Sequence, residues 1–189
     1  MKGLGNMIDL LSTEKAFLEP HIREGGTVVD FTLGNGHDTL WLSRKVGENG
    51  KVYSFDIQKQ AIESAGSLLE SENAPKNYTL INSSHHLVKD FVKEKICAGM
   101  FNLGYLPGGD KSITTMHETT LPAIEAAIEL LENGGGLLIA VYPGHPEGAV
   151  EGELIHEMLS KLDRKQICVS KLQIVNSPTS PFFFLVEKK

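Results

Sequence analysis

The chain has 189 residues, of which 41% are hydrophobic and 22% are charged, and its formal net charge is −6. This length and composition predict one soluble globular domain, residues 1–189, with a substantial core. The acidic balance argues against a general nucleic-acid binder, because contacts to phosphates need clustered lysine and arginine, although a local basic patch could still serve.

The N-terminal segment and the two cysteines bear on the location of the protein. The first twenty residues contain neither a sustained apolar core nor a small-residue cleavage site, so we expect no signal peptide and no membrane anchor. Cys97 and Cys168 have no motif spacing. They are therefore expected to be reduced thiols of a cytoplasmic protein without a zinc site.

Helical and strand patterns alternate along the chain, as in a parallel sheet covered by helices. An opening helix is expected over residues 7–20. Strands are predicted from Thr27 and over 51–56, 78–82, 96–103 and 136–141, and helices over 39–46, 58–72, 89–94, 120–131 and 153–162. Two late strands, 166–174 and 182–187, are expected to form an antiparallel hairpin at the sheet edge. An exposed edge invites pairing, so a homodimer is possible.

The segment TVVDFTLGNGHDT, residues 27–39, reads as a buried strand, a glycine-rich turn and the start of a helix near Asp38. Gly34 and Gly36 would let the backbone approach a ligand, and the helix would direct its positive end at the same place. Asp56 ends the next strand, 20 residues after Gly36, where a carboxylate reaches a ribose hydroxyl pair. The pattern is typical of a nucleotide cofactor site.

The residues of this segment also bear on which cofactor binds. Thr39 stands where a dinucleotide fingerprint has its third small residue, and Asp30 at the end of the strand would repel a pyrophosphate. A carboxylate there suits a cationic amino group such as that of S-adenosylmethionine. The residues favour this cofactor over a nicotinamide dinucleotide, although a G-x-G turn also occurs in ordinary loops.

Polar residues follow the third and fourth predicted strands. Ser84 or His85 could hydrogen-bond an adenine edge, or could be capping and surface residues. NLGYLPGGDK, residues 102–111, is a turn-rich loop at the point where the strand order reverses. Its first four residues resemble the Asn-Pro-Pro-Tyr element of methyltransferases that act on amino groups. In that arrangement the Asn102 carbonyl oxygen accepts an N–H bond from the amine, and Tyr105 forms an aromatic wall.

An amine substrate needs a proton acceptor. Its pKa is near ~10, like that of lysine, and the protonated form has no lone pair. Asp110 is the first candidate acceptor, followed by His145 and His117, with water as a further possibility. Each of these side chains could instead be structural.

The motifs DFTLGNGHDT, FDIQ, FNLGYLPGGDK, YPGH and FFFLVEK together resemble the MnmM or YtqB-type family, whose members have been labelled rRNA methylases, over nearly the whole chain from about Leu10. The resemblance implies a Rossmann-like class I S-adenosylmethionine-dependent methyltransferase. Its α/β fold would have a seven-stranded, mostly parallel sheet, a C-terminal antiparallel hairpin and helices on both faces. The implied reaction methylates the amino nitrogen of 5-aminomethyl-(2-thio)uridine at the tRNA wobble position, with the anticodon region of tRNA as partner.

The expected site follows from the resemblance and the residues above, and it includes no metal. The expected catalytic residues are Asn102, Tyr105 and Asp110. The expected cofactor residues are Asp30, Thr32, Gly34, Asn35, Gly36, His37, Asp38, Thr39, Asp56, Ile57, Gln58, Ser84, His85 and Asn102. The expected substrate residues are Leu106, Gly108, Gly109, Lys111 and His145. Two alternatives stay open: an rRNA or small-molecule methyltransferase with the same pocket, and a nicotinamide oxidoreductase or idle nucleotide-binding module.

Overall fold

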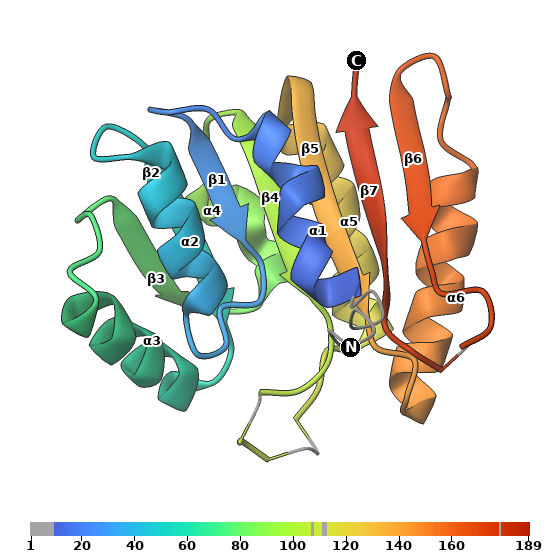
Figure 1. Ribbon diagram of the computed structural model, residues 1–189, viewed down its shortest axis with the longest axis horizontal. Helices are drawn as coiled ribbons and strands as arrows, with labels where there is room; N and C mark the ends of the chain where they lie inside the picture. Colours follow the sequence, from blue (N-terminus) through green and yellow to red (C-terminus); the bar gives the residue numbers. More distant parts are fainter. Residues whose placement is uncertain (1–9, 107, 111–112, 178) are drawn as a thin grey trace, which may run out of the picture.

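A seven-stranded sheet in the order β3-β2-β1-β4-β5-β7-β6 forms the centre of the computed structural model, which describes residues 10–106, 108–110, 113–177 and 179–189 (Figure 1). The strands are β1 (Thr27–Asp30), β2 (Lys51–Asp56), β3 (Tyr78–Asn82), β4 (Ile96–Asn102), β5 (Leu131–Val141), β6 (Ile167–Leu172) and β7 (Phe182–Lys188). The first five pair in parallel, and β7 is antiparallel to both β5 and β6. The predicted sheet and its antiparallel hairpin are confirmed.

Helices cover both faces of this sheet, as predicted. They are α1 (Leu10–Leu18), η1 (Glu19–His21), α2 (His37–Val46), α3 (Lys59–Ser71), η2 (His85–Leu87), α4 (Val88–Phe91), α5 (His117–Leu130) and α6 (Pro146–Ser160). Figure 1 shows α1 and α2 on one face, with α4 and α5 on the other. Residues 7–9 of the predicted first helix lie outside the described residues.

Alternation along the strands divides the core between the two faces. Val28 packs with α1 and α2 through Leu18 and Leu42, whereas Val29 belongs to the cluster under α5 and α6. Phe31 and Phe101 are fully buried in this second cluster, and their rings stack with centroids 4.1 Å apart. The central strands are buried on both faces, which is why their sequences are apolar runs.

Two helices begin earlier than the sequence predicts. The helix α5 starts at His117 rather than Thr120 because the His117 N–H donates to Glu147 Oε1 over 3.1 Å, a cap supplied by another helix. The helix α6 starts at Pro146 rather than Glu153, and its N-cap is the imidazole of His145, which accepts from the Gly148 N–H. Gly148 and Gly152 in its first two turns lower the intrinsic helix propensity, so the sequence pattern does not indicate a helix there.

The outer edges of the sheet are β3 and β6. Pairing of two chains through the β6–β7 hairpin stays a prediction. Within the part of the chain that the structure describes, no helix combines the length and the apolar character needed to cross a membrane.

Candidate active site

Two cavities open beside the carboxyl ends of β1 and β4, where the strand order reverses. The first has a volume of about 360 Å³ and is lined mainly by residues that follow β2, β3 and β4. The second, of about 630 Å³, is lined by α1, the glycine-rich loop and the segments after β4 and β5. Thr32, Asn102, Gly104 and Tyr105 line both. The predicted switch point is thus where the structure places its cavities.

Asp56 joins the glycine-rich loop to the first cavity. Its Oδ2 accepts the Gly34 N–H over 3.0 Å, and its Oδ1 accepts the Gln58 N–H over 2.9 Å. Burial raises the pKa of this carboxyl group. Each oxygen retains acceptor capacity beyond these bonds, and Asp56 lines the first cavity with Ile57 and Gln58. Asp56 thus reaches a cavity, and its contact with a ribose stays a prediction.

Asp30 and Thr39 lie behind the loop rather than in a cavity. Both are fully buried, and neither is among the lining residues of the two cavities. Asp30 Oδ1 accepts the Thr32 N–H over 3.1 Å, and its Oδ2 accepts the Thr39 hydroxyl over 2.7 Å. Burial, with the nearby Asp38 and Asp56 carboxylates, raises the pKa of Asp30 to about 7. These residues shape the loop, and their direct contact with a cofactor stays a prediction.

Gly36 has a packing reason to be glycine, and the expected approach of a ligand at this position stays a prediction. Its φ is +88°, and a Cβ there would lie 2.7 Å from the Ala65 Cβ of α3. The missing side chain therefore lets the start of α2 pack against α3. Gly34 also has positive φ, but a Cβ there would meet only ordinary contacts, with Leu106 at 3.7 Å. Asn35 lines the second cavity and accepts from Ser64 Oγ over 3.2 Å.

His85 has a defined tautomer. Its Nδ1 lies 3.0 Å from the Phe31 carbonyl oxygen, which can only accept, so Nδ1 carries the hydrogen and Nε2 is an acceptor. Burial lowers the pKa of His85 to about 4. The Nε2 atom is buried with no hydrogen-bond partner among the described residues. His85 and Ser84 both line the first cavity, and their contact with an adenine edge stays a prediction.

Asn102 occupies the junction of the two cavities. Its backbone N–H donates to Thr32 Oγ1 over 2.7 Å, and its Nδ2 donates to Asp38 Oδ2 over 2.6 Å. A carboxylate only accepts, which assigns the amide nitrogen to the Asp38 side and leaves Oδ1 as an acceptor. The Tyr142 hydroxyl lies 3.5 Å from that oxygen. Asp38 also pairs with Lys15 over 2.6 Å.

The loop after β4 places its predicted residues unequally. Tyr105 is 41% exposed and lines both cavities, and the buried Leu106 lines the first. Gly108 is exposed and Gly109 is half-buried. Asp110 is exposed and is not among the residues that line either cavity. The predicted substrate contact of Lys111 lies outside the described residues.

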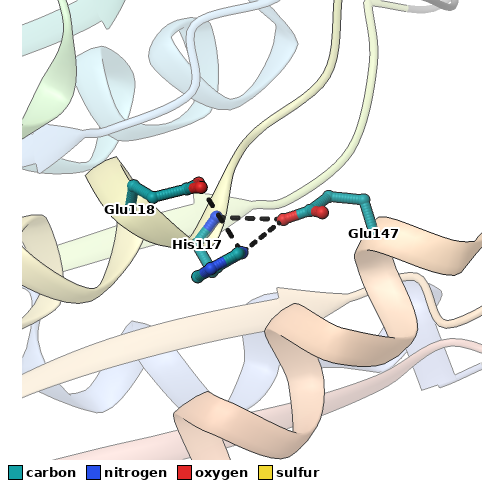
Figure 2. A group of neighbouring side chains, drawn as sticks. All are labelled: His117, Glu118 and Glu147. Carbon is teal, nitrogen blue, oxygen red and sulfur yellow. Dashed lines mark hydrogen bonds and ion pairs between the residues drawn. The ribbon is translucent and has the colours of Figure 1, made fainter.

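The two histidines considered as proton acceptors are both engaged. His145 Nδ1 accepts the Gly148 N–H over 3.0 Å, so the hydrogen of the neutral ring is on Nε2; the residue lines the second cavity as a helix cap. His117 Nδ1 lies 2.8 Å from Glu147 Oε1, and this hydrogen bond raises the pKa of His117 (Figure 2). His117 does not line either cavity. Neither histidine is placed as a general base for a ligand there.

Glu14 and Tyr142 are among the residues of the second cavity that the sequence interpretation missed. Glu14 is only 5% exposed. It lies one helical turn from both Leu10 and Leu18, so a carboxylate in an apolar stripe was the available signal. Tyr142 directly follows β5 and opens the YPGH motif.

The sheet order, the glycine-rich loop after β1 and the acid after β2 are those of the class I fold of S-adenosylmethionine-dependent methyltransferases. The family model described as "Putative rRNA methylase" matches residues 52–188. The chain belongs to this family.

Sequence and structure comparisons agree with this membership. The chain is 41% identical over 181 residues to the "tRNA (mnm(5)s(2)U34)-methyltransferase, chloroplastic" of Arabidopsis thaliana, covering 90% of this chain and 66% of the relative. It thus spans just under two thirds of that protein. A "putative rRNA-methylase" from Clostridium thermocellum superposes with a TM-score of 0.92 and 38% identity, over 98% of this chain and 100% of the other. A "putative methyltransferase" from Streptococcus mutans, in complex with SAH, superposes with a TM-score of 0.88 and 35% identity. This match covers 97% of this chain and 100% of the other.

Proposed function

We propose that this chain is an S-adenosylmethionine-dependent N-methyltransferase that acts on the aminomethyl group of 5-aminomethyl-(2-thio)uridine at the tRNA wobble position, giving the methylaminomethyl form. The observation that carries the proposal is the fixed amide of Asn102 at the junction of two cavities, with Oδ1 as an acceptor. The likeness to the Arabidopsis enzyme supports the choice of substrate.

The residues around the cavities fit the cofactor. The volumes of about 360 and 630 Å³ lie in the range of roughly 300–1,000 Å³ for small-molecule sites. In the first cavity, Asp56 suits ribose hydroxyls, the 58% exposed Ile57 offers an apolar face, and the Nε2 acceptor of His85 suits an adenine amino group. Asp38 adds negative charge beside a ligand whose sulfonium and ammonium groups are positive.

The protein contributes orientation rather than a covalent step. When bound, the cofactor would supply a methyl group from its positively charged sulfur. The amine nitrogen would bond to the methyl carbon as the bond between that carbon and the sulfur breaks. Asn102 Oδ1 would accept an N–H of the amine and aim its lone pair. Tyr105 would form the wall that both ligands share. Precise placement of this kind supplies a large part of the rate in bimolecular reactions.

The amine must lose a proton before transfer. His145 caps α6 and His117 is bonded to Glu147. Asp110, the first candidate acceptor, is exposed and lines neither cavity, so we assign the proton to solvent water. An Asp110→Asn variant with an unchanged pH–rate profile would remove Asp110 from the candidates.

The anticodon region of tRNA is the proposed partner, and the net charge of −6 implies local contacts that weaken as salt rises.

A cytoplasmic location belongs to the same proposal. The free thiols of Cys97 and Cys168 are consistent with a reducing compartment. A homodimer is also retained as part of the proposal, to be checked by sedimentation.

The test is nucleoside mass spectrometry of tRNA that lacks the final wobble methyl, after incubation with the protein and S-adenosylmethionine. A gain of one methyl on 5-aminomethyl-2-thiouridine is the expected result. The Asn102→Ala variant is the control, with calorimetry of S-adenosylhomocysteine binding run in parallel. No gain by a protein that binds the cofactor would remove this substrate. Ribosomal RNA, the second candidate suggested by the family description, is assayed beside it.

A further inference from the structure

The two ends of the loop that follows Asn102 are hydrogen-bonded to each other at Gly104 and Thr115, and we call this pair the neck of the loop. The Gly104 N–H donates to Thr115 Oγ1 over 2.9 Å, and the Thr115 N–H donates back to the Gly104 carbonyl over 2.9 Å. Tyr105 and Thr114 form an antiparallel β-bridge directly beyond this pair. The outgoing and returning legs are therefore joined immediately below the sheet, where Figure 1 shows the loop leaving β4.

A buried carboxylate holds this neck from outside. Glu151, in the second turn of α6, has no exposed surface. Its Oε2 accepts the Thr115 hydroxyl over 2.9 Å, and its Oε1 accepts the Thr120 hydroxyl over 2.5 Å. Burying a carboxylate is unfavourable unless its oxygens are bonded. Burial raises the pKa of Glu151, and the two hydroxyls oppose that rise.

A second carboxylate of α6 holds the returning leg one turn away. Glu147 Oε1 accepts the His117 N–H over 3.1 Å and lies 2.8 Å from His117 Nδ1 (Figure 2). Glu147 and Glu151 are spaced by one helical turn, so they reach the start of α5 from the same side of α6. The position of this end of the loop is thus set by α6.

The hydrogen of Thr115 links the carboxylate to the loop. An ionised Glu151 accepts but does not donate, so the Thr115 hydroxyl donates its hydrogen bond to Glu151, and the Thr115 oxygen accepts the Gly104 N–H. Gly104 lies two residues after Asn102 and precedes Tyr105, and all three line both cavities.

We propose that Thr115 and Glu151 are positioning residues for the Asn102–Tyr105 element, acting through the Gly104 N–H. This inference rests on the proposed methyl transfer for its kinetic readout. Thr115 also lines the first cavity, but the role proposed here is exerted through the Gly104 N–H and not through a contact with the reacting nitrogen. Their effect is on where Asn102 Oδ1 and the Tyr105 ring stand relative to the two ligands.

The experiment compares Thr115→Val with Thr120→Val in the full chain. Both variants remove a hydroxyl that donates to Glu151, but only Thr115 also accepts from Gly104. Thr115→Ser keeps the hydroxyl and tests rescue. The readouts are kcat on the tRNA substrate, affinity for S-adenosylhomocysteine, melting temperature, and hydrogen exchange of the Gly104 and Tyr105 amides.

We expect Thr115→Val to lower kcat by at least about tenfold with cofactor affinity changed less than about threefold, since misplacement of a positioned group affects mainly the chemical step. Thr120→Val should retain kcat within about threefold despite a similar loss of stability, and Thr115→Ser should restore kcat. Equal kcat losses in the two valine variants, full activity of Thr115→Val, or failure of Thr115→Ser to rescue would overturn the proposal.

The exchange readout separates this proposal from the proposed substrate. If wild-type protein does not methylate the tRNA, the substrate is wrong, and the amide exchange still decides the role of the neck. Faster hydrogen exchange of the Gly104 amide in Thr115→Val than in Thr120→Val supports the proposed positioning role of Thr115. The same exchange rate in both variants contradicts it.

Discussion

The side-chain amide of Asn102 donates to Asp38 Oδ2 over 2.6 Å, and this contact connects β4 to the first turn of α2. It decides which end of the amide is available to a ligand. With Nδ2 held by a carboxylate, Oδ1 is the acceptor, as a substrate amine requires. Lys15 pairs with the other oxygen of Asp38, so the opening helix α1 also supports the arrangement.

The first prediction concerns Asn102 itself. Asn102→Ala should lower kcat by about 10²–10³-fold, the effect of removing one oriented polar group from a reaction centre. Affinity for S-adenosylhomocysteine should change only a few-fold, because the contact proposed for the amide is with the amine and not with the cofactor. Steady-state kinetics on undermethylated tRNA and calorimetry provide the two measurements. Normal turnover with intact binding would show that the amine is oriented by other groups.

The second prediction uses Asp38 as the partner in a double-mutant cycle. Asp38→Ala should reduce kcat by about tenfold, since the Asn102 amide can then rotate. In an Asn102→Ala background the same change should have little further effect on kcat. Additive losses would mean that Asp38 acts on the substrate or cofactor independently of Asn102.

The third prediction is a pH dependence set by Asp30. Burial and neighbouring carboxylates raise its folded pKa to about 7, above the unfolded value of 3.8. The native chain therefore holds a proton that the unfolded chain has lost, and this contribution to stability is complete below pH ~4 and disappears as the pH rises through 7. The loss amounts to at most about 4 kcal/mol.

Urea unfolding of wild type and Asp30→Asn between pH 4 and 8 measures the contribution of Asp30 to the free energy of unfolding. The asparagine keeps an oxygen for the Thr32 N–H and has no carboxyl proton to lose. Its stability relative to wild type should rise with pH across the window. Parallel pH profiles would show that Asp30 titrates with an ordinary pKa.

His85 gives the fourth prediction, with the opposite sign. Burial lowers its folded pKa to about 4 from 6.5, so stability is present above pH ~6.5 and is lost as the pH falls towards 4, by about 3 kcal/mol. His85→Gln removes the titration and should flatten this limb of the unfolding profile. His85→Phe should also weaken S-adenosylhomocysteine binding by about tenfold, the effect of one lost hydrogen bond. Unchanged affinity would mean that Nε2 does not face the cofactor.

Most strands were predictable because their signals are local, whereas β5 begins at Leu131 and not at Gly136 as predicted. The bounds of β2 and β3 match the prediction residue for residue, since each apolar run is flanked by turn residues. The starts of α5 and α6 were not predictable in the same way. The cap of α5 comes from Glu147, thirty residues away, and α6 has glycines at 148 and 152 in its first two turns.

The site shows the same division between local and long-range information. The loop and Asp56 were recognisable from spacing, and the structure brings Asp56 and the loop residues Asn35, His37 and Asp38 to the cavities. Gly34 and Gly36 are not among the lining residues of either cavity. The burial of Asp30, the capping role of His145 and the neck formed by Thr115 and Glu151 depend on contacts between elements far apart in the chain. Spacing along one sequence does not encode which side of a loop such residues occupy.

The fifth prediction separates two reasons for a glycine. Gly25 and Gly36 both have positive φ, +74° and +88°, but a Cβ at Gly25 meets no described atom within 4 Å, whereas one at Gly36 lies 2.7 Å from Ala65 Cβ. Gly25→Ala should destabilise the fold by about 1 kcal/mol, the cost of the backbone conformation alone. Gly36→Ala should add an overpacking cost of roughly 1–3 kcal/mol, because α2 and α3 must move apart.

Adding Ala65→Gly to Gly36→Ala tests that assignment, because it removes the atom that the new methyl group meets. The double variant should recover the overpacking part in chemical denaturation and retain the cost of the positive φ, apart from about 1 kcal/mol for a glycine within α3. Cofactor affinity should follow the same order, since Gly34 and Asn35 precede this contact in the loop. A double variant no more stable than Gly36→Ala would place the requirement for glycine in the backbone conformation and not in the packing of α2 on α3.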